Sequence, residues 1–492
     1  MMPFTQLELR STAVLECAHS LVTAAQCREV HGRDSIHVTQ ALLSFVLALR
    51  QAQTCGVEMP LSLQFGDDAI YHDGALLLAP SLQARTLLRA LTRREVATLT
   101  FQPELGVEEC NRLFDLLLQD QNQDALLRQH REHSLRAFGV RHVRITSSTP
   151  ADPGNRTAAM LDATRPDLHQ YQELIDALQQ SSAAAVHDRA VGVDRAAGTI
   201  ERTLIRLEQE PSGLLSLAAQ DNVDRFTVGH SVRVALLALQ VARAAGADRE
   251  KLVEVGIAAL LHDIGKSKVP QEILWKRGKL DEGEWVWMAQ HPRLGADILL
   301  EQPDVHASAI GAAFCHHMDG HGGGYPSTLL PVQPSGVSRL VRVCDVFEAL
   351  TSVRPYKRAL TPIEAYAVMR RHQRDFDPRW LRLFVRTLGA FPQGSRIRLD
   401  DGSMALVLRQ GRTPAEPAVR LLTGPGGTDL STGAPDEITI GQRVDGTVRT
   451  VQSVYTRDRS VPVPEEGFDA LDYLTQTVHG ACLRRGCDED AD

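Results

Sequence analysis

The sequence lacks the features that identify several large classes of protein. It has no run of about 18 uncharged apolar residues, so we expect no transmembrane helix. Its first residues show no basic start followed by an apolar core, so no secretory signal is expected. The eight cysteines are scattered and form no CxxC pair. This usage is typical of a reduced cytoplasm rather than of a disulfide framework, and it predicts a cytoplasmic protein with no membrane partner.

The charge balance excludes a further class of function. The chain has 53 basic and 61 acidic residues, and its formal net charge is −8. A general nucleic-acid binder would instead carry a basic face, so DNA is not an expected partner. A small phosphate ligand remains compatible with this charge, because bound metal ions supply the local positive charge at such sites.

The N-terminal part of the chain mixes helical and strand-like patterns. Apolar residues recur at helical spacing over residues 7–49, interrupted only by Gly32 and Ser35. Residues 62–74 alternate and then turn, which predicts a β-hairpin, and residues 140–145 resemble an edge strand. We therefore predict an α+β domain here. Its position in the chain favours a regulatory or dimerising role, because no sensory motif identifies its input.

The length of 492 residues is sufficient for about two to four domains. A stretch rich in Ser, Thr, Pro, Asp and Gly predicts a linker, and the patterns after it predict connecting helices, a central all-α domain and a small β-rich segment. The connecting helices could form a stalk, a homodimer seam or a hairpin packed on the next domain. The predicted bounds are 1–146 for the α+β domain, 147–158 for the linker, 159–212 for the connecting helices, 213–390 for the central domain, 391–480 for the β-rich segment and 481–492 for a flexible acidic tail.

Seven side chains with metal-binding chemistry recur within the central domain. They are imidazoles and carboxylates without thiolates, a set that suits a hydrolytic metal pair rather than a structural zinc site. They are His230, His262, Asp263, His291, His316, His317 and Asp345.

The adjacent pair His262-Asp263 is the strongest signal among them. It follows the apolar run 255–261, which predicts a buried helix. Adjacent helical residues diverge by about 100°, so His262 can bind one ion while the two oxygens of Asp263 bridge a pair of ions. A bare carboxylate in such a core would be costly unless a cation or partner compensated its charge. The same argument applies to Asp345, which lies in the apolar helical segment 340–347.

The other histidines each have a structural alternative. His230 starts an apolar helix and could cap it or fill the core. His291 precedes Pro292, where the chain must leave helical geometry, so it could be an exposed histidine at a helix end. His316 and His317 close an apolar helix, and two adjacent histidines rarely both serve only as core residues.

Three further motifs accompany these residues. They are His262-Asp263-Ile264-Gly265-Lys266, Gly324-Tyr325-Pro326, and the run that begins at Asp345 and finishes with Arg354-Pro355-Tyr356-Lys357. Together the residues resemble an HD-GYP domain, the bacterial class of cyclic di-GMP phosphodiesterases within the HD phosphohydrolase superfamily. The resemblance covers about residues 195–390 and implies an HD-type helical fold for the central domain. It implies that the protein hydrolyses cyclic di-GMP to linear pGpG, and onward to GMP, in second-messenger signalling.

The resemblance also implies a division of labour. One ion would be held by His262, Asp263, Asp345 and His230, and the other by Asp263, His291, His316 and His317. Two divalent ions about 4 Å apart would activate a water and hold the phosphate oxygens of a diester. Iron or manganese is the family expectation, and zinc suits the same ligands.

The substrate contacts follow from the same resemblance. Lys266 would neutralise the phosphate or protonate the leaving group, and its alternative is a solvated lysine at a helix end. Tyr325, Arg354 and Lys357 match positions that line the pocket or bind the dinucleotide phosphates. Surface turns often contain sequences such as GGGYP, and the basic residues could instead form a solvated face.

The sequence departs from the family pattern at three positions. Met318 follows the twin histidines where relatives carry Glu, and His321 stands where relatives carry Asp. Phe226 replaces a glutamate of three-metal relatives, so we expect a two-metal site. The alternatives to a cyclic di-GMP hydrolase are a hydrolase of another cyclic dinucleotide and a weakly active module that binds the dinucleotide and signals through a protein partner.

Overall fold

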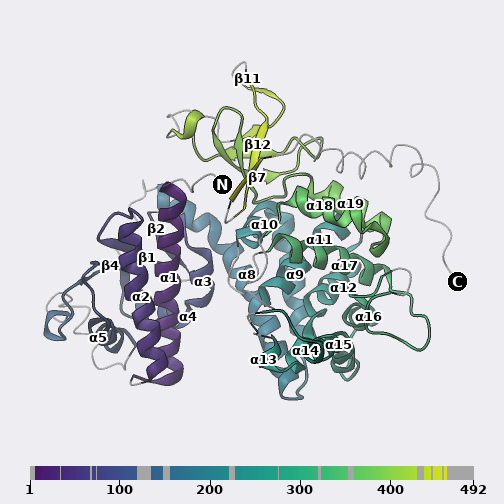
Figure 1. Ribbon diagram of the computed structural model, residues 1–492, viewed down its shortest axis with the longest axis horizontal. Helices are drawn as coiled ribbons and strands as arrows, with labels where there is room; N and C mark the ends of the chain where they lie inside the picture. The colour runs from purple at the N-terminus through teal and green to yellow at the C-terminus, as the bar shows by residue number, and fades with distance from the viewer. Residues whose placement is uncertain are drawn as a thin grey trace. The chain divides into compact units, whose positions relative to one another are not determined.

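The computed structural model describes most of the chain. The described residues are 6–33, 35–66, 69–73, 75–118, 135–147, 156–220, 228–274, 276, 278–319, 323–352, 359–428, 437–444, 447–456 and 459–462. Their contacts divide the chain into one unit of Met1–His169 with Gln220–Val223 and a second of Gln170–Ala219 with Asp224–Asp492. Figure 1 shows helices and strands in the first unit, and helices followed by a small sheet in the second.

The first unit begins with two long helices, α1 (Gln6–His31) and α2 (Ile36–Thr54). The predicted interruption between them is confirmed. Gly32 has a φ of 73°, a conformation that glycine adopts without strain. The Ser35 side chain then accepts a hydrogen bond from the backbone N–H of His37, which caps α2.

The sheet of this unit has the strand order β3-β2-β1-β4-β5, with every neighbouring pair antiparallel. The predicted hairpin is confirmed as β1 paired with β2, and the predicted edge strand as β5. The strands are β1 (Leu61–Phe65), β2 (Ile70–His72), β3 (Ala75–Leu76), β4 (Val96–Phe101) and β5 (Val143–Ser147).

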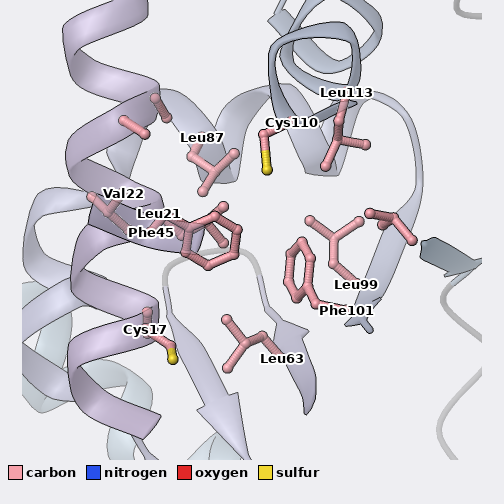
Figure 2. Close-up of a cluster of buried hydrophobic side chains, with 14 of the residues drawn as sticks. Cys17, Leu21, Val22, Phe45, Leu63, Leu87, Leu99, Phe101, Cys110 and Leu113 are labelled. Carbon is pink, nitrogen blue, oxygen red and sulfur yellow. The ribbon is translucent and has the colours of Figure 1, made fainter. Parts of the chain in front are cut away.

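The core of the first unit lies between the helices and the sheet. Burial alternates along β1, so Leu63 points inward and pairs in register with Leu99 of β4. Phe45 of α2 meets Phe101 of β4 edge to face, with ring centroids 5.2 Å apart (Figure 2). Among the described residues of this unit, three shorter helices follow β3 and β4: α3 (Leu78–Gln83), α4 (Arg85–Arg93) and α5 (Val107–Leu118).

The next segment is helical, with α8 (Arg156–Val186), α9 (Val193–Gln209) and α10 (Pro211–Gln220). The buried Gln170 amide of α8 donates to Thr203 Oγ1 of α9 at 3.1 Å, which ties these two helices together. Most of the predicted linker lies outside the described residues, so its bounds stay a prediction.

The central part of the chain is helical, as the sequence predicts. Several of its helices begin at side-chain caps, among them Asp248, Asp281, Ser335 and Thr361. The elements are α11 (Val228–Ala244), α12 (Arg249–Leu261), η2 (Ile264–Lys268), α13 (Gln271–Leu274), α14 (Glu282–Met288), α15 (His291–Leu300), α16 (Ala307–Cys315), α17 (Gly336–Thr351), α18 (Pro362–Arg371), η3 (Gln373–Asp375) and α19 (Pro378–Leu388).

The predicted β-rich segment is confirmed as a sheet of order β13-β12-β6-β7-β8-β9 beside a small hairpin of β10 and β11. The strands are β6 (Arg396–Leu399), β7 (Met404–Arg409), β8 (Ala418–Leu421), β9 (Ile438–Thr439), β10 (Arg443–Val444), β11 (Thr447–Val448), β12 (Val451–Thr456) and β13 (Arg459–Pro462). The acidic tail lies outside the described residues. Among the helices that the structure describes, none has the length and hydropathy needed to cross a membrane.

Candidate metal centre

The structure brings the seven predicted ligand residues together from α11, α15 and α17 and from the turns that end α12 and α16. Within each of two groups, one ligand atom from every residue lies within 4.8 Å of the others. The first group is Asp263, His291, His316 and His317, and the second is His230, His262 and Asp345. These clusters have the donor chemistry and spacing to hold metal ions.

The HD pair lies at a helix end rather than inside a helix, which corrects the helical placement expected from the sequence. Helix α12 ends at Leu261, His262 is its C-cap, and Asp263 leaves helical geometry with φ −99° and ψ 10°. The short 3-10 helix η2 then carries Lys266 back toward Asp263. The change of direction lets the carboxylate and the imidazole face the same interior space.

Gly265 brings this turn against the start of α15. A Cβ at Gly265 would lie 2.0 Å from the His291 carbonyl oxygen and 2.4 Å from the Gly295 nitrogen. Only a residue without a side chain permits this approach. The contact therefore sets how close His291 comes to Asp263.

His291 itself begins α15, with Pro292 in the first turn, whereas the sequence predicted that the chain leaves helical geometry there. A proline is tolerated in a first turn because its missing N–H has no helical partner in any case. His291 is only 1% exposed, so the alternative of an exposed histidine at a helix end is wrong.

Asp263 belongs to the first group but also faces the second, because one of its carboxylate oxygens points toward each. Its Oδ1 is 3.3 Å from His291 Nε2 and 3.6 Å from His316 Nε2. Its Oδ2 is 3.5 Å from His262 Nε2 and 3.7 Å from His230 Nε2. This is the arrangement that a carboxylate shared by two cations requires.

Hydrogen bonds orient three of the histidines toward the interior. The Nδ1 atoms of His262, His291 and His316 donate to the carbonyls of Ala259, Met288 and Ala313 at 2.7, 2.7 and 2.9 Å. Each Nε2 then carries a lone pair that points into the cluster, as in histidines that bind metals. Among the described residues, no hydrogen-bond partner reaches the buried Nε2 of His262. A metal cation fits this donor set, since it accepts these lone pairs.

Burial sets the protonation state of these rings. It lowers the pKa of His262 to about 4 and that of His291 to about 3, and it lowers the pKa of His317 well below its ordinary range. These rings are therefore neutral near pH 7, which is the form that binds metals. Asp345 is ionised, because hydrogen bonding and charge from His230 outweigh burial and hold its pKa well below the usual range.

Glu348 is a buried residue of this site that the sequence analysis missed. It is 3% exposed, contacts Nδ1 of His230 and accepts from Arg233 Nε at 2.6 Å. Burial alone would lower the pKa of His230, but the nearby charge of Glu348 and hydrogen bonds to Asp345 and Glu348 raise it to about 9. Glu348 follows Asp345 by three residues on α17, so helical spacing alone would have placed both on one face.

Lys266 and Tyr325 border the cluster. Lys266 Nζ lies 2.5 Å from Asp263 Oδ2, with 19% of its side chain exposed. The Tyr325 ring stacks on His317 at 4.5 Å between centroids. Gly324 permits this, because it has a φ of 86° and a Cβ there would lie 2.1 Å from the His317 carbonyl oxygen. Burial raises the pKa of Tyr325, so its hydroxyl stays protonated and able to donate.

Some of the remaining predicted positions lie outside the described residues, and others do not. Arg354 and Lys357 lie outside the described residues, as do His321 and Phe226. Met318 is 3% exposed, and its backbone forms a β-bridge with Gly324. Its thioether therefore lies at a buried position beside the cluster, where the family resemblance led us to expect a carboxylate.

Comparison with known proteins gives matches that cover part of the chain. The HD domain family matches residues 214–380. The chain is 37% identical over 234 residues to cyclic di-GMP phosphodiesterase PA4108 of Pseudomonas aeruginosa, covering 47% of this chain and 56% of that relative. It is 34% identical over 216 residues to cyclic di-GMP phosphodiesterase response regulator RpfG of Xanthomonas campestris, covering 43% of this chain and 56% of that relative.

A third relative is named for a different substrate. The chain is 34% identical over 168 residues to 3'3'-cGAMP-specific phosphodiesterase 3 of Vibrio cholerae, covering 34% of this chain and 36% of that protein. The chain thus spans about half the length, or less, of these curated relatives.

Proposed function

We propose that the chain, whose residues 214–380 match the HD domain family, is a metal-dependent phosphodiesterase of the HD-GYP class that hydrolyses cyclic di-GMP. The observation that carries the proposal is the position of Asp263, whose two oxygens face two separate groups of ligand atoms. A structural metal site needs no such shared carboxylate, whereas a hydrolytic pair does.

The proposed site holds two divalent ions. Asp263, His291, His316 and His317 would hold one, and His230, His262, Asp345 and Asp263 would hold the other. When bound, such ions lower the pKa of a water and polarise a phosphate. Iron or manganese is our first choice, and zinc is chemically compatible with the same donors.

The residues of the chain then act on the diester. Lys266 would offer its ammonium group to the phosphate or pass a proton to the leaving 3′ oxygen. Arg354, Lys357 and the Tyr325 hydroxyl would bind and orient the dinucleotide. Water adds across the bond between phosphorus and the 3′ oxygen, giving linear pGpG, and a second hydrolysis gives GMP. As part of the same proposal, the protein is cytoplasmic and either forms a homodimer or binds a signalling partner.

The test is hydrolysis by the full chain after loading with manganese, iron or zinc, with products separated by chromatography. We expect conversion of cyclic di-GMP to pGpG, and its loss in Asp263→Ala. Cyclic GMP-AMP should be assayed beside it, because one relative is specific for that compound. Full turnover by the Asp263→Ala protein would overturn the proposal.

A second candidate function is a weakly active module that binds the dinucleotide and signals through a partner. Met318 favours it, because a buried thioether cannot supply the second hydrogen bond that a carboxylate would give a ligand histidine. Tight binding of cyclic di-GMP without hydrolysis under all three metals would favour this candidate over the enzyme.

A further inference from the structure

An exposed tryptophan lies next to the proposed active site. Trp285, on α14, is 49% exposed, and its ring meets that of Tyr325 edge to face at 5.6 Å between centroids. Tyr325 in turn stacks on His317 at 4.5 Å with the ring planes 22° apart. An unbroken series of rings therefore runs from the ligand His317 through Tyr325 to Trp285 at the surface.

The faces of these rings are not equally available. His317 covers one face of Tyr325, and Tyr325 also meets His291 at 6.2 Å between centroids. Trp285 contacts Tyr325 at one side and is otherwise half open to solvent. Its indole is therefore an extended flat surface beside the cluster, within the reach of a base attached to a phosphate held there.

Helix α14 holds this surface in place. Asp281 caps the helix by accepting from Glu284 N at 2.9 Å, and Glu284 accepts from Asp281 N at 2.8 Å. The Lys276 ammonium adds an ion pair to Glu284 at 2.5 Å. A fixed helix lowers the conformational entropy that would be lost when a ligand stacks on its side chain.

We propose that Trp285 is the stacking surface for one purine base of the cyclic dinucleotide, a role that rests on the proposed function. Aromatic side chains bind bases through stacking that tolerates both guanine and adenine, because every base offers a π face. Trp285 thus sets the affinity for the substrate and takes no part in the chemical step. It binds the base and is not one of the proposed metal ligands.

The same helix provides a matched control. Trp287 is also 49% exposed, and two helical positions turn its side chain by about 200° from that of Trp285. Both residues lie at the surface, so their replacement leaves the core intact. If the two variants differ in substrate affinity, the cause is therefore where the indole lies and not simply the loss of an indole.

Steady-state kinetics of the metal-loaded full chain test the proposal. We expect Trp285→Ala to raise KM for cyclic di-GMP by roughly 5- to 150-fold with kcat nearly unchanged, which is the range for loss of one stacked base. Trp285→Phe should restore most of the affinity, and Trp287→Ala should behave as wild type. Metal content should be equal in all four proteins.

Ligand binding gives a readout that does not depend on turnover. Cyclic di-GMP should quench the tryptophan fluorescence of the metal-loaded chain on rapid mixing, before hydrolysis proceeds, and the quenching should be lost in Trp285→Phe but kept in Trp287→Phe. An unchanged KM in Trp285→Ala, or a loss of kcat alone, would overturn the role of Trp285 while leaving the proposed enzyme intact. A wild-type chain that neither hydrolyses nor binds the dinucleotide would overturn both.

Discussion

His291 Nε2 lies 3.2 Å from His316 Nε2, although both rings already donate their Nδ1 protons to backbone carbonyls. In the neutral state each Nε2 is an acceptor, and two lone pairs at this distance repel in a buried site. A cation between them would accept both lone pairs. Two neutral rings in this arrangement therefore oppose each other unless a cation lies between them.

Metal removal should destabilise the protein for this reason. We expect a chelator to lower the melting temperature of the central helices and manganese to restore it. A metal present at 100 times its dissociation constant contributes about 2.7 kcal/mol to the free energy of unfolding. Differential scanning calorimetry checks this, with Asp263→Ala as the variant in which manganese should give little shift. An equal shift in that variant would contradict the assignment.

Glu348→Gln should weaken the metal site without altering any proposed ligand. Glu348 contacts His230 Nδ1 and Arg233, so the neutral amide removes the charge that orients and polarises the imidazole. Loss of such a partner lowers metal affinity by about 10- to 100-fold. Competition with a fluorescent chelator measures it. Glu208→Gln, which changes a carboxylate that is 60% exposed and paired with Arg249, should leave the affinity unchanged.

Gly265→Ala should push the turn that carries His262 and Asp263 away from α15. The added methyl group would meet the His291 carbonyl oxygen and the Gly295 nitrogen, so one of the two segments must shift. We expect a loss of about 1–3 kcal/mol in the free energy of unfolding, together with reduced metal content. Gly336→Ala is the control, because a Cβ there meets nothing within 4 Å. Equal stability and metal content in both variants would contradict the close approach.

Much of this arrangement could be predicted from the sequence, because local patterns determine it. The spacing of apolar residues predicted the helices, and the break between α1 and α2 at Gly32 and Ser35 was predicted correctly. The start of α15 was predicted wrongly, because Pro292 is compatible both with a helix end and with a first turn. The local pattern could not distinguish a helix end from a first turn, because packing against Gly265 decides which of the two forms.

Contacts between distant segments were beyond the reach of local patterns. Trp285 and Tyr325 are far apart in the sequence, with α15 and α16 between them, and nothing in the periodicity of either segment predicts their contact. The sequence predicted the ligand residues through spaced motifs and a family resemblance. Which carboxylate oxygen faces which histidine depends on how helix ends meet, and this follows only from the three-dimensional structure.

The first unit should show an acid-sensitive contact of its own. Glu109 of α5 accepts from the backbone of His142 at 2.6 Å and contacts the His142 ring at 2.8 Å. Burial opposes ionisation of this carboxyl, but these hydrogen bonds hold its pKa below the ordinary value of 4.5. Its contribution to stability is therefore complete above about pH 4.5 and is lost as the pH falls through the lower folded pKa.

Amide hydrogen exchange of α5 and β5, corrected for intrinsic rates, measures this loss between pH 6 and pH 3. Glu109→Gln should be less protected than wild type at pH 6 and should show a flatter dependence on pH. Its neighbour Glu108 is a matched control, because its side chain is 64% exposed and pairs with Arg112 at the surface. A wild-type dependence in Glu109→Gln would contradict the assignment.

The central claim is that Asp263 is shared by two cations, and anomalous diffraction from manganese-loaded crystals tests it most directly. The account predicts two peaks about 4 Å apart, one among His291, His316 and His317, the other beside His262 and Asp345, and both in contact with Asp263. A single peak, or peaks that do not touch Asp263, would contradict it.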